Sequence, residues 1–553
     1  MHKNAVSRRH PRFLLHNESQ KMTKIIRDSS ILDELEAFDA TLQHYDDEKP
    51  VVRPVPTLVT PYDIIDQEDA DEESGALSPF SQDALACALG RSGWDTNAKY
   101  VDEWGRWCQW NGSHWEVDKK MVSFTLIRKF LRAEVVRLVT EAQVSRDMAV
   151  VSGLGEDEIK SREKLVTAAI RNGKDTLQKN GIAAVESLSR SNVASAALVE
   201  DFDGDLMLLG TPGGTVDLKT GILRPGERED MITKMTRVTP AGPGAKPEKF
   251  LKFLHTILDG DEEVIGFIKR YFGYALTGSV EEHKVAFFYG EGRNGKGVLM
   301  NTVYELLGDY ARRSPVETFL KKVSSHPTDI AGLAGARFVV GSEVPAGTTW
   351  NEAQIKDMTG GDILTARLMR QDYFDFMPQF TLFLHGNDQP AFRSVGTSIR
   401  ERMVLVPFSR TFTEDERNTK LQREMIDEEG PEILRWMIEG AVEWARRAED
   451  GKSGLGVPDI LKKASKEYFD REDEIGEFIN DEMILDASEF ISGSDIFAKF
   501  QSWNDQRGGE RRSQREIMKE LRKRGLKDAR SGTERGLKGL RAITGQDRAD
   551  MVG

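Results

Sequence analysis

The segment from Val285 to Leu307 holds the residues in this sequence that are best suited to bind phosphate. It contains the spacing Gly290-x-x-x-x-Gly295-Lys296. Glycines permit backbone angles that turn successive N–H groups toward one point, and a lysine ammonium reaches the outer phosphates of a nucleotide. The expected ATP contacts are Gly290, Glu291, Gly292, Arg293, Asn294, Gly295, Lys296, Gly297 and Val298. A glycine-rich surface turn is the alternative interpretation.

The flanking residues favour the phosphate loop. An apolar run, Val285 to Tyr289, precedes the turn, and apolar residues at helical spacing follow it from Val298 to Leu307. This pattern predicts strand, loop and helix in that order, so the positive N-terminal end of the helix would face the phosphates. One residue departs from the usual motif. The Ser or Thr that follows the lysine and ligates magnesium is replaced by Gly297.

Two further apolar runs end in polar residues suited to nucleotide hydrolysis. Phe338 to Ser342 is followed by Glu343, the expected ligand of Mg²⁺ and of the attacking water. Phe380 to His385 is followed by Asn387, whose amide suits a sensor of the γ-phosphate. The alternatives are an exposed acid on an edge strand and an Asn that forms a turn.

Arg400 and Arg402 stand directly before a fourth apolar run, Met403 to Pro407. An arginine in this place suits an arginine finger, worth ~10³–10⁵ in rate when it acts on a neighbouring subunit. The alternative is a surface salt bridge to Glu401.

Length and composition narrow the class of protein. A chain of 553 residues predicts about three domains. A net charge of −14 restricts DNA contacts to local basic patches. Two cysteines exclude a disulfide framework, and no apolar stretch approaches the ~18 residues of a membrane span. We therefore expect a soluble protein of a reducing cytoplasm with no membrane partner.

The N-terminal part is expected to hold a tail and a scaffold. Residues 1–80 carry a like-charge acidic run and read as a flexible tether with one short helix, Ser30 to His44, with a partner-binding segment as the alternative. Met22 is an alternative start. Beyond this tail, Asn111-Gly112 between alternating tryptophans predicts a hairpin. Its tryptophans suit a packed sheet face, or else stacking on bases.

Taken in order, the motifs resemble those of superfamily 3 helicases of the phage/plasmid primase–helicase group, related to the poxvirus-type primase–helicase. The matching residues lie between Ser81 and Thr411: Gly290-x-Gly292-x-Asn294-Gly295-Lys296, Gly335 to Glu343, Lys356 to Asp362 with Ala366-Arg367, Phe376-x-Pro378, Asn387-x-x-Pro390, and Arg402-Met403 ahead of Val406-Pro407-Phe408.

The resemblance implies an AAA+-type motor that assembles as a ring, typically a hexamer, and moves on single-stranded DNA from 3′ to 5′. Lys296 would hold the phosphates, Glu343 magnesium and water, and Asn387 the γ-phosphate. Arg402, or else Arg400, would be the finger. Residues 1–80 show no zinc-ligand set and no paired acids at strand spacing, so priming activity is not expected in this chain. A separate primase or other replisome proteins would be its partners, and the resemblance to phage proteins implies the cytoplasm of a bacterial host cell.

The segment from Lys356 to Phe376 matches the family's DNA-contacting hairpin. Its residues alternate as in a hairpin, with the tip near Arg370. Lys356, Arg367 and Arg370 are the expected phosphate contacts, with ordinary surface charges as the alternative.

The C-terminal tail is locally basic. Twelve Lys or Arg stand against four Asp or Glu between Arg511 and Arg541. Three helix-like segments followed by two strand-like pieces predict a winged helix. Arg512, Arg515, Lys519, Arg522 and Lys523 are expected to line its third helix and bind DNA, with a solvated helix as the alternative.

Together these features predict an α/β protein with an AAA+-like P-loop ATPase core, a mixed α/β N-terminal module and a C-terminal winged helix. The expected parts are a tail (1–80), the module (81–239), the core (240–415), a helical connector (416–472) and the winged helix (473–553). The expected activity is that of an ATP- and Mg²⁺-dependent DNA helicase of phage or prophage replication. A replication initiator that binds ATP with little hydrolysis is the alternative.

Overall fold

The computed structural model describes residues 78–321, 327–342, 348–370, 372–387, 389–392, 396–449, 451, 453–471, 473–507, 511–544 and 547. The chain divides into two units, Met1–Ala76 and Leu77–Gly553. Every described residue belongs to the second unit. The expected tail, including the helix from Ser30 to His44 and the alternative start at Met22, falls outside the described residues apart from its last three positions.

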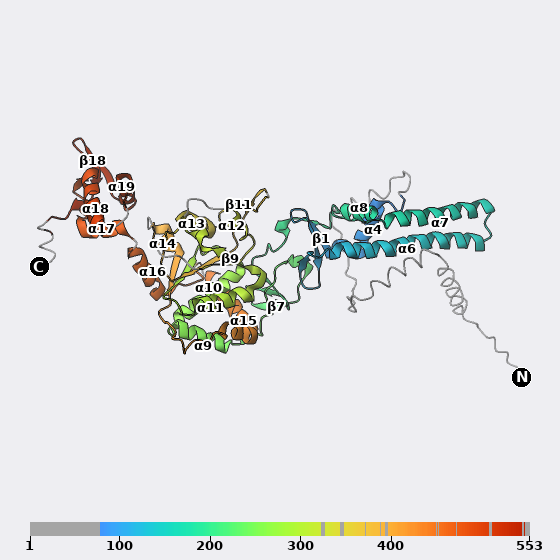
Figure 1. Ribbon diagram of the computed structural model, residues 1–553, viewed down its shortest axis with the longest axis horizontal. Coiled ribbons are helices and arrows are strands. Elements are labelled where there is room, and N and C mark those ends of the chain that lie inside the picture. The colour runs from blue at the N-terminus through green and yellow to red at the C-terminus, as the bar shows by residue number, and fades with distance from the viewer. Residues whose placement is uncertain are drawn as a thin grey trace. The chain divides into compact units, whose positions relative to one another are not determined.

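Residues 78–239 combine helices with two small sheets (Figure 1). The sheets have the orders β3-β2-β1-β4 and β5-β6-β7. The elements are α4 (Gln82–Leu89), α5 (Asp95–Asn97), β1 (Ala98–Val101), β2 (Arg106–Trp110), β3 (Trp115–Val117), α6 (Val122–Val151), α7 (Glu156–Thr176), α8 (Lys179–Ser189), β4 (Ala196–Ala197), β5 (Leu208–Thr211), β6 (Gly214–Asp217) and β7 (Ile222–Arg224).

The predicted tryptophan hairpin is confirmed as the antiparallel pair β2–β3, in which Trp110 lies opposite Trp115. Trp107 and Trp115 are 5% and 1% exposed. Their indole N–H groups donate to Glu186 and to the Arg228 carbonyl. Both rings are therefore enclosed with their polar atoms satisfied, which supports sheet packing over base stacking for these two residues.

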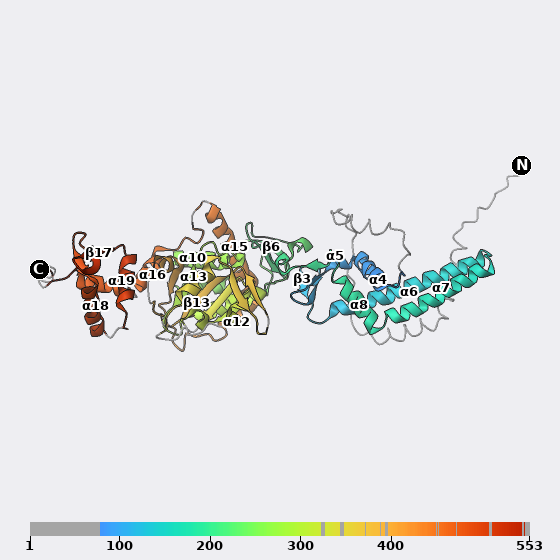
Figure 2. The ribbon, with the colours of Figure 1, turned by 90° about the horizontal axis from the view of Figure 1, so that it is seen from above.

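Residues 240–471 are built around a five-stranded parallel sheet of order β14-β8-β13-β10-β9 (Figures 1 and 2). The strands are β8 (Val285–Tyr289), β9 (Ala311–Pro315), β10 (Phe338–Ser342), β13 (Thr381–Gly386) and β14 (Met403–Pro407), and β11 (Leu364–Arg367) pairs separately with β12 (Tyr373–Phe376). The helices are α9 (Glu248–Ile257), α10 (Glu262–Thr277), α11 (Lys296–Leu307), α12 (Pro327–Ala331), α13 (Glu352–Gly360), α14 (Thr397–Arg402), α15 (Leu421–Glu449) and α16 (Asp459–Arg471). The chain is thus a mixed α/β protein with a parallel sheet.

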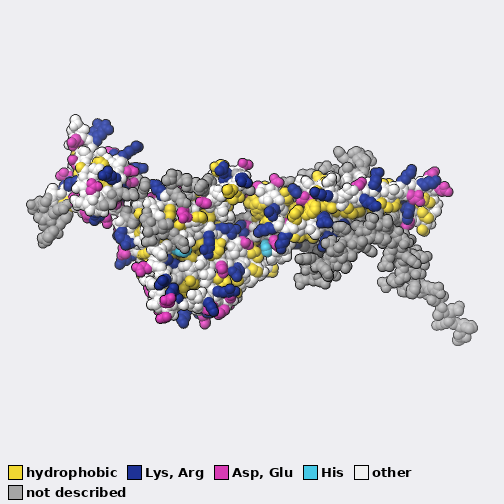
Figure 3. All heavy atoms as spheres, viewed as in Figure 1, with side chains coloured by type: hydrophobic (Ala, Val, Ile, Leu, Met, Phe, Trp, Pro, Cys, Tyr) yellow, Lys and Arg dark blue, Asp and Glu magenta, His cyan; other side chains and the backbone are white. Residues whose placement is uncertain are grey.

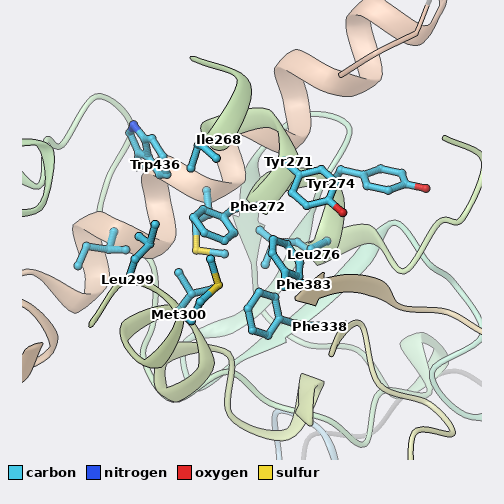
Figure 4. Packing of buried hydrophobic residues seen from close by; sticks show 14 of the residues in the cluster. Ile268, Tyr271, Phe272, Tyr274, Leu276, Leu299, Met300, Phe338, Phe383 and Trp436 are labelled. Atoms are coloured by element: carbon cyan, nitrogen blue, oxygen red, sulfur yellow. The ribbon is translucent and has the colours of Figure 1, made fainter. Parts of the chain in front are cut away.

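Alternate residues of each strand enter two different cores. Phe288, Val340 and Phe383 pack with α9, α10, α11 and α15. Phe287 and Leu384, one position away on their strands, pack with α13, α14 and α16. Figure 4 shows the first core, where side chains of α10 and α11 meet those of β10 and β13. Burial on both faces explains why these strands read as continuous apolar runs.

The two helices α10 and α15 cross at a pair of glycines. A Cβ on Gly273 or Gly440 would lie closer than 3.0 Å to backbone atoms of the opposite helix. Both positions therefore require glycine for this close approach. The segment expected as a connector, 416–472, contributes α15 to the main core in this way.

The edge strand β9 was not predicted. Its Arg312 and Arg313 are exposed, so the segment lacks the apolar run of the inner strands. It is a strand because it pairs in parallel with β10.

The C-terminal elements are α17 (Glu474–Glu482), β15 (Met483–Ile484), β16 (Phe490–Ser492), α18 (Gly493–Arg507), α19 (Gln514–Lys523), β17 (Lys527–Ser531), β18 (Glu534–Lys538) and β19 (Arg541–Ala542). The predicted three helices followed by strands are confirmed, with short strands β15 and β16 added. One detail was wrong. Arg512 does not lie on the third helix, because Ser513 and Glu516 form a capping box that starts α19 at Gln514.

Within the described part of the chain, no helix has the length and apolar character needed to cross a membrane.

Candidate functional site

The loop between β8 and α11 is held in a conformation that needs its glycines. Gly290 and Gly295 have φ of 148° and 87°, and Arg293 has φ of 66°. A Cβ on Gly295 would lie 2.8 Å from Ile257 of α9. Positive φ and the lack of space both exclude larger residues at Gly295, so the glycine spacing follows from the backbone path.

The amide groups of this loop face no acceptor in the part of the chain that the structure describes. Among the described residues, the backbone N–H groups of residues 291–295 donate no hydrogen bond. The loop is held by other groups. The Phe412 N–H donates to the Arg293 carbonyl at 2.9 Å, and the buried Asn294 amide donates to the Glu291 carbonyl at 2.6 Å. A run of free N–H groups at a helix N-terminus is a binding site for anionic oxygens.

Lys296 and Asn387 meet beside this loop. The buried Lys296 ammonium donates to the Gly290 carbonyl at 2.6 Å and to the Asn387 side-chain oxygen at 3.5 Å. Burial lowers the pKa of Lys296 to about 8. The structure thus brings together two predicted site residues, one from α11 and one from the end of β13. Their donors fit a triphosphate.

The expected magnesium ligand, Glu343, lies outside the described residues, directly after the end of β10. At Gly297 an added Cβ would meet nothing within 4 Å, so space is open where the usual hydroxyl ligand would stand. No cluster of three acidic, His or Cys side chains suited to a metal occurs among the described residues. A magnesium ion would be held by Glu343, nucleotide oxygens and water.

His385 is a neighbour of the site that sequence reasoning missed. It lies on β13, two residues before Asn387, and pairs in register with Ser342 at the end of β10. Burial, with the positive charges of Lys296 and Arg313, lowers the pKa of His385 to about 4. The imidazole is therefore neutral at pH 7. The sequence signal that could have identified His385 is a titratable side chain in the otherwise apolar strand β13.

The two candidate finger arginines lie in the last turn of α14, away from the loop of their own chain. Arg400 pairs with Asp470 at 3.1 Å and Asp473 at 3.4 Å. Arg402 donates to the Ser398 hydroxyl at 2.8 Å, and its buried Nε has no hydrogen-bond partner among the described residues. A finger acts on a neighbouring subunit, so this role stays a prediction.

The predicted hairpin is confirmed as the antiparallel pair β11–β12. Arg367 lies over the ring of Tyr373 at 4.8 Å, and the two residues face each other in register. Arg370 lies in the turn with φ of 62°, beside Met369, which is 79% exposed. Lys356 lies on α13, 3.8 Å from Glu352. The hairpin therefore presents apolar, aromatic and cationic side chains to its surroundings.

A second candidate site is a groove of about 680 Å³ in the C-terminal elements. It is lined by Arg515 and Arg522 of α19 and by Arg530 and Arg535 of the β17–β18 hairpin. Arg530 and Arg535 lie directly opposite each other, and sequence reasoning had missed both. In the view of Figure 3, Lys and Arg side chains are prominent over these elements.

The cations in and around this groove differ in their pairing, and Arg512 is not among the residues that line it. Arg512 pairs with Glu474 at 2.6 Å and Arg522 with Asp528 at 2.9 Å. Within the described residues, Arg515, Arg530 and Arg535 have no ion-pair partner, and their guanidinium groups are free to bind an anion. Lys519 is exposed on α19, whereas the Lys523 side chain lies outside the description.

Comparison with protein families gives two matches. Residues 91–259 match the family described as "D5 N terminal like", and residues 288–402 match a "Family of unknown function (DUF5906)". The second match spans the loop, β10, the β11–β12 hairpin, β13 and α14.

The chain is also similar to viral proteins. It is 25% identical over 426 residues to "Putative helicase L207/L206" of Acanthamoeba polyphaga mimivirus, covering 72% of this chain and 43% of the relative. It is 25% identical over 344 residues to "Putative helicase 184R" of Invertebrate iridescent virus 6, covering 56% and 35%. The chain therefore spans less than half the length of these relatives.

Among solved structures, the C-terminal region of NrS-1 (305-718) in its apo form matches with a TM-score of 0.37 and 12% identity, covering 66% of this chain and 90% of that chain. The match of residues 91–259 to the family described as "D5 N terminal like" and the similarity to viral putative helicases confirm the resemblance to the phage/plasmid and poxvirus-type primase–helicase group that was read from the ordered motifs.

Proposed function

We propose that this protein is an ATP-dependent DNA helicase of phage or prophage replication, which assembles as a ring and moves on single-stranded DNA. One observation carries the proposal. Free loop N–H groups, the Lys296 ammonium and the Asn387 amide converge at the carboxyl ends of β8 and β13. Donors of this kind suit the β- and γ-phosphates of ATP.

Residues 240–415 are proposed as an AAA+-like P-loop core. The strand that leads into the loop, β8, is an inner strand of the parallel sheet and is flanked by β13 and β14. Arg400 and Arg402 directly precede β14. The ring, expected to be a hexamer, would place one of these arginines at the phosphates of the next subunit.

Each site residue has a distinct part in the proposed reaction. Lys296 neutralises charge on the outer phosphates, and Asn387 bonds the γ-phosphate or the attacking water. Glu343 would hold Mg²⁺ and the attacking water, and a bound Mg²⁺ would supply charge neutralisation at the phosphates.

Two surfaces are proposed for DNA. The β11–β12 hairpin offers Arg367, Arg370 and the exposed Tyr373 to a single strand, whose bases stack on aromatic rings. The C-terminal elements are proposed as a winged helix, in which α19 and the β17–β18 hairpin offer a groove with free arginines to the phosphate backbone. A separate primase is the expected partner.

The second candidate is a replication initiator that binds ATP with little hydrolysis. Gly297, which lacks the usual hydroxyl, favours it. The pairing of Arg400 with Asp470 and Asp473 also favours it, since a finger must leave these carboxylates to act on a neighbour.

The test combines one variant with one assay. Lys296→Ala is expected to abolish DNA-stimulated ATP hydrolysis while circular dichroism shows an unchanged fold. Retained turnover would contradict the proposed site. A fork-unwinding assay with ATP and Mg²⁺ separates the two candidates, because the initiator would bind the fork without displacing a strand.

A further inference from the structure

The turn that follows Asn387 is anchored to the end of α16. The Tyr468 hydroxyl donates to the Pro390 carbonyl and accepts the Trp350 indole N–H at 3.2 Å. Tyr468 is 1% exposed, and its ring centroid lies 5.8 Å from that of Phe392. The carbonyl three residues after Asn387 is therefore fixed by a buried hydroxyl from a distant helix.

A second contact ties the same turn to the end of α16. The Gln389 side-chain oxygen accepts from the Arg471 guanidinium at 3.1 Å. Burial raises the pKa of Tyr289, the residue directly before Gly290, and the nearby Arg471 and Gln389 act against that rise. Two polar contacts thus join the end of α16 to the turn, close to the residue that leads into the loop.

We propose that Tyr468 is a positioning residue of the nucleotide site, which holds the turn so that the Asn387 amide meets the γ-phosphate. The inference rests on the proposed function, since it requires that ATP binds the loop. The Lys296–Asn387 contact of 3.5 Å is at the long end of hydrogen-bond distances, so a small shift of the turn would break it.

A positioning role and a purely structural role of Tyr468 predict different effects on nucleotide affinity. If the Tyr468 hydroxyl only stabilised the fold, its removal would lower the melting temperature without changing the preference for ATP over ADP. A positioning hydroxyl changes the contact with the γ-phosphate, which ATP has and ADP lacks. The ratio of ATP to ADP affinity is therefore the informative quantity.

Tyr468→Phe keeps the ring and removes the hydroxyl. In the full chain with Mg²⁺, we expect its affinity for a non-hydrolysable ATP analogue to fall about threefold to tenfold, the effect of one hydrogen bond. Affinity for ADP should stay within about twofold. Arg471→Ala, a substitution of an exposed residue, should also lower the ratio of ATP to ADP affinity.

Tyr310→Phe is the matched control. The Tyr310 hydroxyl is also buried, accepts the Gly210 N–H at 2.8 Å and donates to the Lys234 carbonyl at 3.0 Å, with no contact to the loop. It should lower thermal stability and leave the affinity ratio unchanged.

An unchanged ratio in Tyr468→Phe, or the same fall in Tyr310→Phe, would overturn the inference. If the unsubstituted protein binds neither nucleotide, the proposed function fails first and the inference with it. Nucleotide binding by the unsubstituted protein therefore tells a failure of the proposed function from a failure of the inference about Tyr468.

Discussion

The ammonium of Lys296 lies 3.5 Å from the side-chain oxygen of Asn387, although 91 positions separate the two residues in the chain. The contact exists because β8 and β13 are parallel neighbours, so the loop after one strand and the turn after the other emerge at the same edge of the sheet. Strand pairing therefore assembles the proposed nucleotide site.

Nucleotide affinity should depend on pH through Lys296. Burial lowers its pKa to about 8, and a bound triphosphate favours the charged form. Affinity should thus be highest below pH 8 and fall as the pH rises through this value, with proton uptake on binding. Calorimetry in buffers of different ionisation enthalpy measures the uptake. Lys296→Arg, which stays charged, should bind with a flat pH profile across this range, and a sloping one would contradict the assignment.

Gly297→Ser should tighten magnesium binding in the presence of nucleotide. An added Cβ meets nothing within 4 Å, and the new hydroxyl would stand in the place usual for a magnesium ligand. A Mg²⁺ titration of nucleotide binding measures the increase in magnesium affinity. We expect about tenfold if the new hydroxyl contributes about as much free energy as one hydrogen bond.

The control for this substitution is Gly295→Ser. At Gly295, φ is 87° and an added Cβ would lie 2.8 Å from Ile257, so no side chain can be accommodated. We expect this variant to lose nucleotide binding. If Gly297→Ser behaved in the same way, the space beside Gly297 would not be a ligand position.

Arg530 and Arg535 should contribute to duplex DNA affinity. Replacing both with Ala removes two free cations from the groove, and each lost phosphate contact should lower affinity about fivefold near physiological salt. The slope of log K against log salt should fall by about 0.9 per contact. Fluorescence anisotropy at several salt concentrations measures both.

Arg512→Ala is the matched control, since Arg512 already pairs with Glu474 at 2.6 Å. Its salt slope should be unchanged. An equal fall in the salt slope of Arg512→Ala would show that overall positive charge, and not the groove, determines the DNA affinity.

Arg402→Ala should retain ATP binding and lose hydrolysis by ~10³-fold or more if Arg402 is the finger. Mixing it with Lys296→Ala gives a direct test. In mixed rings a Lys296→Ala subunit offers its intact arginine to the loop of an Arg402→Ala neighbour, so ATPase activity should partly return. No recovery at any mixing ratio would count against an interfacial role.

Gly440→Ala should destabilise the core by ~1–3 kcal/mol or more, because the methyl group has no space between α15 and α10. Thermal unfolding measures the loss. Gly266→Ala on α10 is the control variant, because an added Cβ at Gly266 would meet only the end of the Arg270 side chain, at 3.3 Å. This change should be neutral or stabilising, by up to ~1 kcal/mol.

The local elements of this protein could be predicted from its sequence. The strand, glycine-rich loop and helix of residues 285–307, the tryptophan hairpin, the β11–β12 hairpin and the three C-terminal helices each depend on residues close together in the chain. Periodicity, turn residues and glycine spacing act over such short distances, so their signals are visible without tertiary structure. The family resemblance drew on the same local motifs.

Tertiary structure alone decided which of these residues meet. The strand character of β9 depends on pairing with β10, because its own residues carry no apolar pattern. Arg530 faces Arg535 only through the register of β17 and β18. Arg512, predicted on the third helix as a DNA contact, precedes α19 and is paired with Glu474 of α17. Contacts between distant residues depend on strand order and helix packing, and the local sequence around each residue carries no record of either.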